Sequence, residues 1–248
     1  MKLIDKIAIV TGAARGIGKA TAIEFSKEGA YVIAADINLD GVNDTVKEIK
    51  REGFKATSIQ LDISNLSDIK KKIENIIDKY KKIDILVNNA GLLSRVPILE
   101  MTESEWDRVM NVNLKGTFFL SKEVLPNMIN QRYGKIINLS SLSAKRGGFS
   151  SGVNYGASKA GVISITKYLA NFGASYNINV NAVVPGFADT EMFRSNPSNK
   201  INSIIKSIPL KRVARTDEIA KVIVFLSSED SSYVTGEILD VNGGILMD

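Results

Sequence analysis

Short apolar segments alternate with longer amphipathic segments along this 248-residue chain, and no other feature limits its fold as strongly. The apolar segments are too short for buried helices and too continuous for half-exposed strands, so they predict strands buried on both faces. We expect these strands at Ile7–Val10, Tyr31–Ala35, Ala56–Gln60, Ile83–Val87, Lys135–Leu139, Asn179–Val183 and Ile238–Asp240, and helices near residues 16–28, 40–52, 66–80, 103–130, 154–175 and 216–228. The alternation predicts an α/β fold: a doubly wound parallel sheet of about seven strands with helices on both faces.

The sequence also predicts the domain organisation. No repeat, linker or change of composition divides it, so we expect a single domain over residues 1–248. Residues 187–209 match no strand or long helix and exceed an ordinary connection, which indicates a lid. No apolar run is long enough for a membrane span, and residues 1–12 match a first strand rather than a signal peptide, so a cytoplasmic protein without a membrane partner is expected.

Composition removes several kinds of chemistry. The chain has no cysteine and no histidine, which excludes disulfides, thiolate or histidine metal sites and a Ser-His-Asp triad. We therefore expect no metal, and proton transfer near neutral pH must use Tyr, Lys, Asp or Glu. The net charge of +5 comes from basic residues spaced along helices. Such spacing is typical of solvated helix faces and predicts no nucleic-acid partner.

A glycine-rich loop, TGAARGIG at residues 11–18, follows the first predicted strand and opens the first helix. Gly12 suits a sharp turn, Gly16 a close approach to a pyrophosphate, and Gly18 tight packing of helix on sheet. The helix N-terminus then directs free N–H groups at phosphate. An ordinary tight turn is the alternative, but Asp36 at the end of the next strand is placed to bind a ribose hydroxyl, which favours a dinucleotide site.

Polar or small residues follow four further strands: Asp62-Ile63, Asn88–Gly91, Ser140-Ser141 and Pro185-Gly186. Each alone is explained by a polar turn, but in an open α/β sheet these strand ends meet at the ligand crevice. Tyr155 and Lys159, in the segment GVNYGASKAG, are four apart and would share one helix face. Their alternative is an ordinary surface pair; together with the strand ends they favour a catalytic site.

These motifs are similar to those of the short-chain dehydrogenase/reductase family, over essentially the whole chain. The matching residues are TGAARGIG, Asp36, Asp62, NNAG at 88–91, Asn113 in NVNLKG, Ser141, YGASK at 155–159, PGFADT at 185–190 and the C-terminal VTGEILDVNGG. The resemblance implies a single-domain Rossmann oxidoreductase that uses a nicotinamide cofactor. It implies a catalytic quartet of Asn113, Ser141, Tyr155 and Lys159, and a cofactor site of Gly12, Arg15, Gly16, Ile17, Gly18, Asp36, Ile37, Asp62, Ile63, Asn89, Ala90, Gly91, Tyr155, Lys159, Pro185, Gly186 and Thr190.

The resemblance also implies a role for each catalytic residue. Tyr155 would exchange a proton with the substrate oxygen, and Lys159 would lower the pKa of Tyr155 and bond the ribose. Ser141, rather than its neighbours Ser140 and Ser143, would hold the substrate oxygen, while Asn113 would hold a water. For the cofactor we expect NAD over NADP, because the carboxylate of Asp36 would repel a 2′-phosphate that flexible Arg15 only partly attracts.

The substrate is less constrained. The chain looks closest to 3-oxoacyl-[acyl-carrier-protein] reductases, but sugar and polyol dehydrogenases, such as aldose 1-dehydrogenases, share its motifs. A non-catalytic dinucleotide-binding regulator is a third alternative, disfavoured because Tyr155 and Lys159 are both present. Expected substrate walls are Leu92–Val96, Lys145–Phe149, Phe187, Met192 and Phe193, whose basic residues would meet an acyl carrier protein or be solvated rim charges. The resemblance implies a homotetramer, paired across two-folds through the helices at 103–130 and 154–175 and the C-terminal strand.

Overall fold

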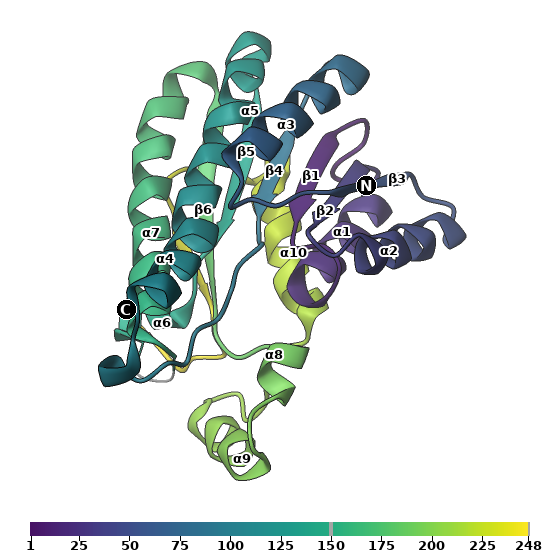
Figure 1. The fold of residues 1–248 in the computed structure, drawn as a ribbon. Helices are drawn as coiled ribbons and strands as arrows, with labels where there is room; N and C mark the ends of the chain where they lie inside the picture. The colour runs from purple at the N-terminus through teal and green to yellow at the C-terminus, as the bar shows by residue number, and fades with distance from the viewer. Residues whose placement is uncertain (149–150, 248) are drawn as a thin grey trace.

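Seven parallel strands form one sheet in the computed structural model, which describes residues 1–148 and 151–247 (Figure 1). The strands are β1 (Ile7–Thr11), β2 (Tyr31–Asp36), β3 (Ala56–Gln60), β4 (Ile85–Asn88), β5 (Gly134–Leu139), β6 (Ile178–Pro185) and β7 (Ile238–Val241). All seven predicted strands are present, with ends that differ by one or two residues. The predicted single α/β domain with a parallel sheet is therefore confirmed.

The strand order β3-β2-β1-β4-β5-β6-β7 makes the sheet doubly wound. The chain builds outward from β1 to β3, then returns to the other side of β1 with β4. The sheet therefore has a topological switch point between β1 and β4. In such sheets the ligand crevice lies outside the carboxyl ends of the strands at this point.

Helices cover both faces of the sheet (Figure 1). They are α1 (Gly16–Lys27), α2 (Leu39–Arg51), α3 (Leu66–Tyr80), α4 (Glu103–Met110), α5 (Thr117–Gln131), α6 (Leu142–Arg146), α7 (Val153–Gly173), α8 (Glu191–Arg194), α9 (Ser198–Ser207) and α10 (Thr216–Ser227). Alternate residues of each strand face opposite sides. Thus Ala8 and Val10 pack with α1, α2 and α10, whereas Ile9 packs with α3, α5 and α7. Within the described residues, no helix combines the length and apolar character that crossing a membrane requires.

The helix expected over residues 103–130 is interrupted, which corrects the prediction. A π-helical turn, Asn111–Gly116, separates α4 from α5. Gly116 packs so closely on the chain after β3 that a Cβ atom there would lie 2.4 Å from the carbonyl oxygen of Ile63. π-helical turns widen a helix and frequently mark functional sites. Here the turn carries Asn113, which is fully buried.

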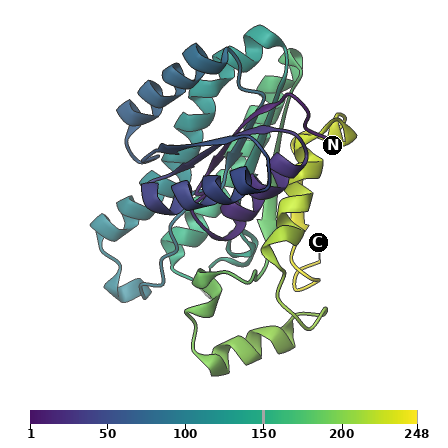
Figure 2. The same ribbon diagram turned by 90° about the vertical axis from the view of Figure 1, so that its right-hand side faces the viewer.

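Residues 187–209, which we call the lid segment, also differ from expectation. No long helix was predicted there, but the segment contains α8 and the ten-residue α9. Pro197 at the start of α9 provides no side-chain cap, so the usual sequence signal for a helix start is missing. Figure 2 shows α8 and α9 extending from one end of the domain, below the sheet.

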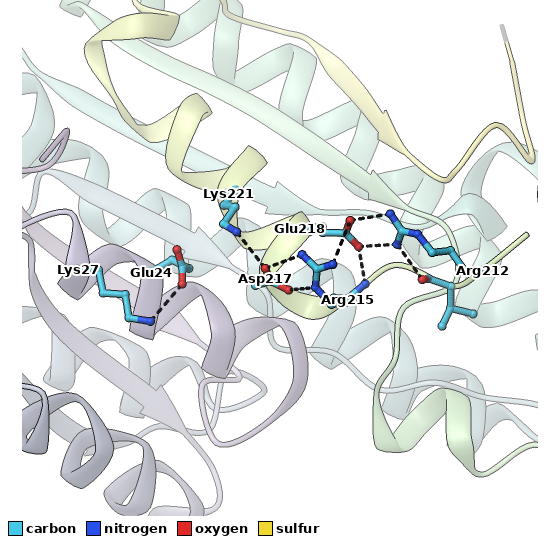
Figure 3. A network of polar contacts seen from close by, with 8 residues as sticks. Glu24, Lys27, Arg212, Arg215, Asp217, Glu218 and Lys221 are labelled. Atoms are coloured by element: carbon cyan, nitrogen blue, oxygen red, sulfur yellow. Dashed lines mark hydrogen bonds and ion pairs between the residues drawn. The ribbon is translucent and has the colours of Figure 1, made fainter. Parts of the chain in front are cut away.

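A charged network fixes the chain where the lid segment leads into α10 (Figure 3). Arg212 donates two hydrogen bonds of 2.7 Å to the carboxylate of Glu218, and that carboxylate also accepts the Arg215 N–H at 2.8 Å. Asp217 bonds the Arg215 side chain and Lys221. The Arg212 guanidinium is the main reason that the pKa of Glu218 falls to about 2, so this anchor keeps its charges in mild acid.

Candidate active site

The glycine loop has the backbone conformation that its sequence predicted. Gly12 and Gly16 have φ angles of +66° and +59°, which side chains other than glycine rarely adopt. A Cβ atom on Gly18 would lie 2.1 Å from the carbonyl oxygen of Gly12, so α1 can start here only without a side chain. Ile17 packs against the core beneath the loop. The result is a bare backbone cradle at a helix N-terminus, which fits a pyrophosphate.

The end of β4 holds this loop in place. The Thr11 hydroxyl accepts the N–H groups of Asn89 and Ala90, each at 3.1 Å. In return the Asn89 side chain donates to the carbonyl oxygens of Thr11 at 2.9 Å and Gly12 at 3.1 Å. Asn89 therefore has a structural role: its side-chain amide links β1 and β4, the two strands that flank the switch point.

Asp36 and Arg15 lie on opposite sides of the glycine loop entrance. One carboxylate oxygen of Asp36 accepts the Ala14 N–H at 3.0 Å, and the other accepts the Asn38 N–H at 2.9 Å. These bonds hold the carboxylate at the end of β2 with acceptor capacity left on both oxygens. Arg15 is directed to α8, where its guanidinium meets Glu191 at 2.6 Å. Ile37 is well exposed beside Asp36.

The other predicted cofactor residues also lie at the carboxyl ends of strands. The Asp62 carboxylate accepts both the N–H and the hydroxyl of Ser64, while Ile63 is buried. Thr190 faces the glycine loop, because a Cβ on Gly16 would lie 3.4 Å from its methyl carbon. Pro185 ends β6, and Gly186 packs against Asn242. Strands from both halves of the sheet thus contribute to one crevice, as a dinucleotide requires.

Lys159 is almost fully buried in α7, and its ammonium donates a 2.7 Å hydrogen bond to the carbonyl oxygen of Leu139 at the end of β5. Burial lowers its pKa to about 8. Gly91 lies against it: a Cβ atom there would be 3.3 Å from the Lys159 ammonium and 3.2 Å from Asn113 Oδ1. The crevice wall at Gly91 is therefore open for a ligand to reach the Lys159 ammonium.

Asn113 joins the loop after β4 to α7. Its Oδ1 accepts the Leu92 N–H at 2.7 Å, and its Nδ2 donates to the Leu92 carbonyl at 2.9 Å and to the Ser158 hydroxyl at 3.1 Å. Both amide hydrogens are thus used within the protein. Ser158 also donates to the Tyr155 carbonyl at 2.8 Å. Ser158 was not predicted, although its place three residues after Tyr155 in a helix puts it on the same side.

The three neighbouring serines have different partners. Ser140 donates to the Lys159 carbonyl at 2.8 Å, and Ser143 accepts a 3.1 Å hydrogen bond from Ser151. Ser141 caps α6, where its hydroxyl accepts the Ser143 N–H at 3.1 Å, and it is the one of the three that acts on the pKa of the Tyr155 phenol, by opposing the rise that burial causes. The geometry therefore brings Ser141, the serine that the motif selected, to the phenol.

The expected effect of Lys159 on Tyr155 is absent from the chain on its own. Burial raises the pKa of the half-buried Tyr155, and the hydrogen bond with Ser141 only opposes that rise. The prediction of a lowered pKa is thus wrong for the protein alone, because the ammonium of Lys159 bonds a backbone carbonyl and its own pKa is lowered by burial. Leu139 could not be found from sequence, since a backbone acceptor has no residue signature.

The structure gives the positions of some, but not all, of the residues expected to form the substrate wall. Lys145 forms a 2.5 Å ion pair with Asp240 of β7, and its place in the substrate wall stays a prediction. Phe187 and Phe193 pack together with ring centroids 5.9 Å apart, and Met192 is exposed on α8. Phe149 lies outside the described residues.

Fold and site together define a class: a Rossmann-type protein with a glycine loop after β1, an acid at the end of β2, and a tyrosine, a serine and a lysine near the end of β5. The family model described as "Enoyl-(Acyl carrier protein) reductase" matches residues 12–246. The chain belongs to the short-chain dehydrogenase/reductase family and is an NAD(P)-dependent oxidoreductase that acts between a carbonyl and an alcohol.

Named relatives cover the whole chain. It is 44% identical over 247 residues to the 3-oxoacyl-[acyl-carrier-protein] reductase FabG of Thermotoga maritima, and 39% identical over 247 residues to that of Pseudomonas aeruginosa, covering 100% of each sequence. Among solved structures, gox2181 is similar with a TM-score of 0.95 and 31% identity, over 98% of this chain and 96% of that one. A putative NAD(P)-dependent gluconate 5-dehydrogenase from Beutenbergia cavernae, with bound NADP, has a TM-score of 0.93 and 33% identity over 98% of both chains.

Proposed function

We propose that the protein reduces the keto group of a 3-oxoacyl thioester, carried on an acyl carrier protein, to a hydroxyl group. The observation that carries this proposal is the burial of Lys159 at the carboxyl end of β5, where its ammonium donates to the Leu139 carbonyl, with Ser141 directly after this strand and Tyr155 one turn before Lys159 on α7. The relatives named as 3-oxoacyl-[acyl-carrier-protein] reductases support the substrate. Tyr155, Ser141, Lys159 and Asn113 are the proposed catalytic residues.

A reduced nicotinamide supplies the hydride when it is bound. Ser141 holds the carbonyl oxygen of the substrate, and Tyr155 donates its phenolic proton to that oxygen as negative charge develops there. A raised pKa suits Tyr155 to this direction, because the phenol stays protonated until the substrate takes the proton. The almost fully buried Lys159 ammonium, one helical turn from Tyr155, stabilises the phenolate that exists only once the proton has left. Asn113 fixes the loop at Leu92 and, with it, the wall of the crevice.

For the cofactor we propose NAD in preference to NADP. The residues that would hold the adenosine ribose are Asp36 and the exposed Ile37, with the glycine loop on the pyrophosphate. The backbone bonds to Asp36 fix a carboxylate where a 2′-phosphate would have to sit, and Arg15 is paired with Glu191. The gluconate 5-dehydrogenase relative has bound NADP, so the test of this proposal measures both cofactors.

A sugar-acid dehydrogenase is the second candidate, favoured by that same structural relative. The absorbance of NADH and NADPH separates the candidates when it is followed with 3-oxoacyl thioesters, aldoses and 5-oxogluconate. We expect the highest kcat/KM with a 3-oxoacyl thioester. A higher value with an aldose or with 5-oxogluconate would contradict the proposal and favour a sugar or sugar-acid dehydrogenase.

A further inference from the structure

A hollow of about 570 Å³ lies next to the proposed catalytic residues and is lined by three segments that are distant in sequence. The loop after β4 contributes residues 95–98, the segment before α7 contributes Gly148 and Ser151, and α9 of the lid segment contributes Lys200. The Gly152 N–H donates to the Ser94 carbonyl, and this bond joins the segment before α7 to the loop after β4. The lid segment is tied to the same wall, because the Arg95 guanidinium donates to its Met192 carbonyl at 3.2 Å.

Hydrogen bonds connect this hollow to the catalytic tyrosine. Ser151, in its wall, donates to the Ser143 hydroxyl at 3.1 Å. The Ser143 N–H donates to the Ser141 hydroxyl at 3.1 Å, and Ser141 is the serine proposed to share the substrate oxygen with Tyr155. A substrate with its carbonyl at Ser141 and Tyr155 thus has this hollow as neighbouring space for the rest of the molecule.

The hollow has an unbalanced charge. Its described lining includes Arg95 and Lys200 and no carboxylate. The Arg95 guanidinium uses one nitrogen on the lid segment, at 3.2 Å from the Met192 carbonyl, which leaves its other nitrogens available. Within the described part of the chain, the Lys200 ammonium has no salt bridge or hydrogen bond. Two cations from separate segments converge there beside the apolar side chains of Val96, Pro97 and Ile98.

We propose that Arg95 and Lys200 form a subsite for an anionic group of the substrate, a phosphate or a carboxylate, while its carbonyl lies at Tyr155. Charge-assisted hydrogen bonds from a guanidinium and an ammonium recognise these oxygens. The inference rests on the proposed function, and it fits a phosphate on the arm of a thioester carrier as well as the carboxylate of an oxo acid. Substrates of matched structure distinguish the two sources.

The experiment compares acetoacetyl-coenzyme A, which carries phosphates, with the acetoacetyl thioester of N-acetylcysteamine, which has the same keto group and no phosphate. For Lys200→Gln we expect the ratio of their kcat/KM values to fall about tenfold toward the neutral substrate. Lys206→Gln, on the same helix but outside the hollow, is the control and should keep the wild-type ratio. Arg95→Gln should lower the ratio, and Arg95→Lys should restore part of it because the charge is kept.

5-Oxogluconate, which carries a carboxylate, tests the second source of the anionic group. A loss of its kcat/KM in Lys200→Gln, with no change in the thioester ratio, would assign the subsite to a carboxylate. An unchanged ratio in both Lys200→Gln and Arg95→Gln, together with unchanged 5-oxogluconate reduction, would overturn the subsite. Failure of the wild type to reduce either thioester would instead overturn the proposed function, and 5-oxogluconate would then decide the subsite alone.

Discussion

The guanidinium of Arg15 lies 2.6 Å from the carboxylate of Glu191 and so connects the glycine loop to α8 of the lid segment. Both side chains are largely exposed, at 76% and 69%, and such pairs contribute at most about 1 kcal/mol. A contact this weak can be exchanged when a ligand enters between the two segments. It also takes Arg15 away from the ribose end of the crevice, which is where Asp36 lies.

We predict that the lid segment closes over the nicotinamide end when cofactor binds. Hydrogen exchange of residues 187–209 should slow on addition of NADH. Glu191→Gln removes the pair with Arg15 and should speed exchange in the free protein, whereas Glu74→Gln, which breaks an exposed pair on α3, should leave this segment as it is. Equal protection with and without NADH would show an ordinary ordered connection.

Cofactor choice should depend on Asp36. We predict that the wild type has a higher kcat/KM with NADH than with NADPH, because the carboxylate repels a 2′-phosphate. Asp36→Ala should narrow the difference between the two kcat/KM values. Ile37→Arg should raise kcat/KM with NADPH relative to NADH, because it adds a cation at an exposed position. Steady-state kinetics with both cofactors test this. A wild type that favours NADPH would mean that Arg15 outweighs Asp36.

Tyr155→Phe should lower kcat by about 10²–10⁴ while NADH binding is kept, since only the proton-carrying oxygen is lost. The control is Tyr168→Phe, on the same helix but 69% exposed, which should keep wild-type activity. Turnover is measured with a 3-oxoacyl thioester and binding by NADH fluorescence. Substantial residual turnover in Tyr155→Phe would remove this residue from proton transfer.

NADH affinity should weaken as pH rises through about 8. The pKa of Lys159 is lowered to about 8, so its ammonium is charged below this pH and progressively neutral above it. A charged donor binds ribose hydroxyls and balances the cofactor phosphates better than a neutral amine, so affinity is highest on the acid side and falls on the alkaline side. Lys159→Arg stays charged and should lack this step in fluorescence titrations between pH 6 and 9.5, which are chosen to bracket about 8. An unchanged step would place the titration elsewhere.

We predict a homotetramer. A shallow hollow of apolar character is lined by Met110, Leu114, Phe118 and Ile165, at the junction of α4, α5 and α7. Phe172, also on α7, is 42% exposed. Exposed apolar surface of this kind is typical of an interface that a symmetric copy covers. Leu120 of α5 and Val162 of α7 belong to the buried core and are not part of this surface. A monomer in sedimentation at micromolar concentration would contradict the prediction.

The sequence predicted what depends on local chemistry. Buried parallel strands need continuous apolar residues, and the glycine loop needs positive φ at Gly12 and Gly16, so both leave a residue-level signal. The π-helical turn leaves none, because it depends on the contact of Gly116 with the carbonyl of Ile63 from a distant strand end. The ion pair of Lys145 with Asp240 likewise joins groups that only the finished sheet brings together.

The central place of β1 governs how the sheet can grow during synthesis. β1 is made first, but its second neighbour, β4, is complete only at residue 88, about 4–15 s later at ordinary translation rates. Until then one side of β1 has unpaired backbone groups, which is the condition that invites wrong pairing between nascent chains. From β5 onward each new strand pairs with the one made before it, so the sheet then extends at one edge alone and β7 is added last. The risk of wrong pairing at β1 therefore lasts as long as the synthesis of residues 12–88, and it ends when β4 pairs with β1.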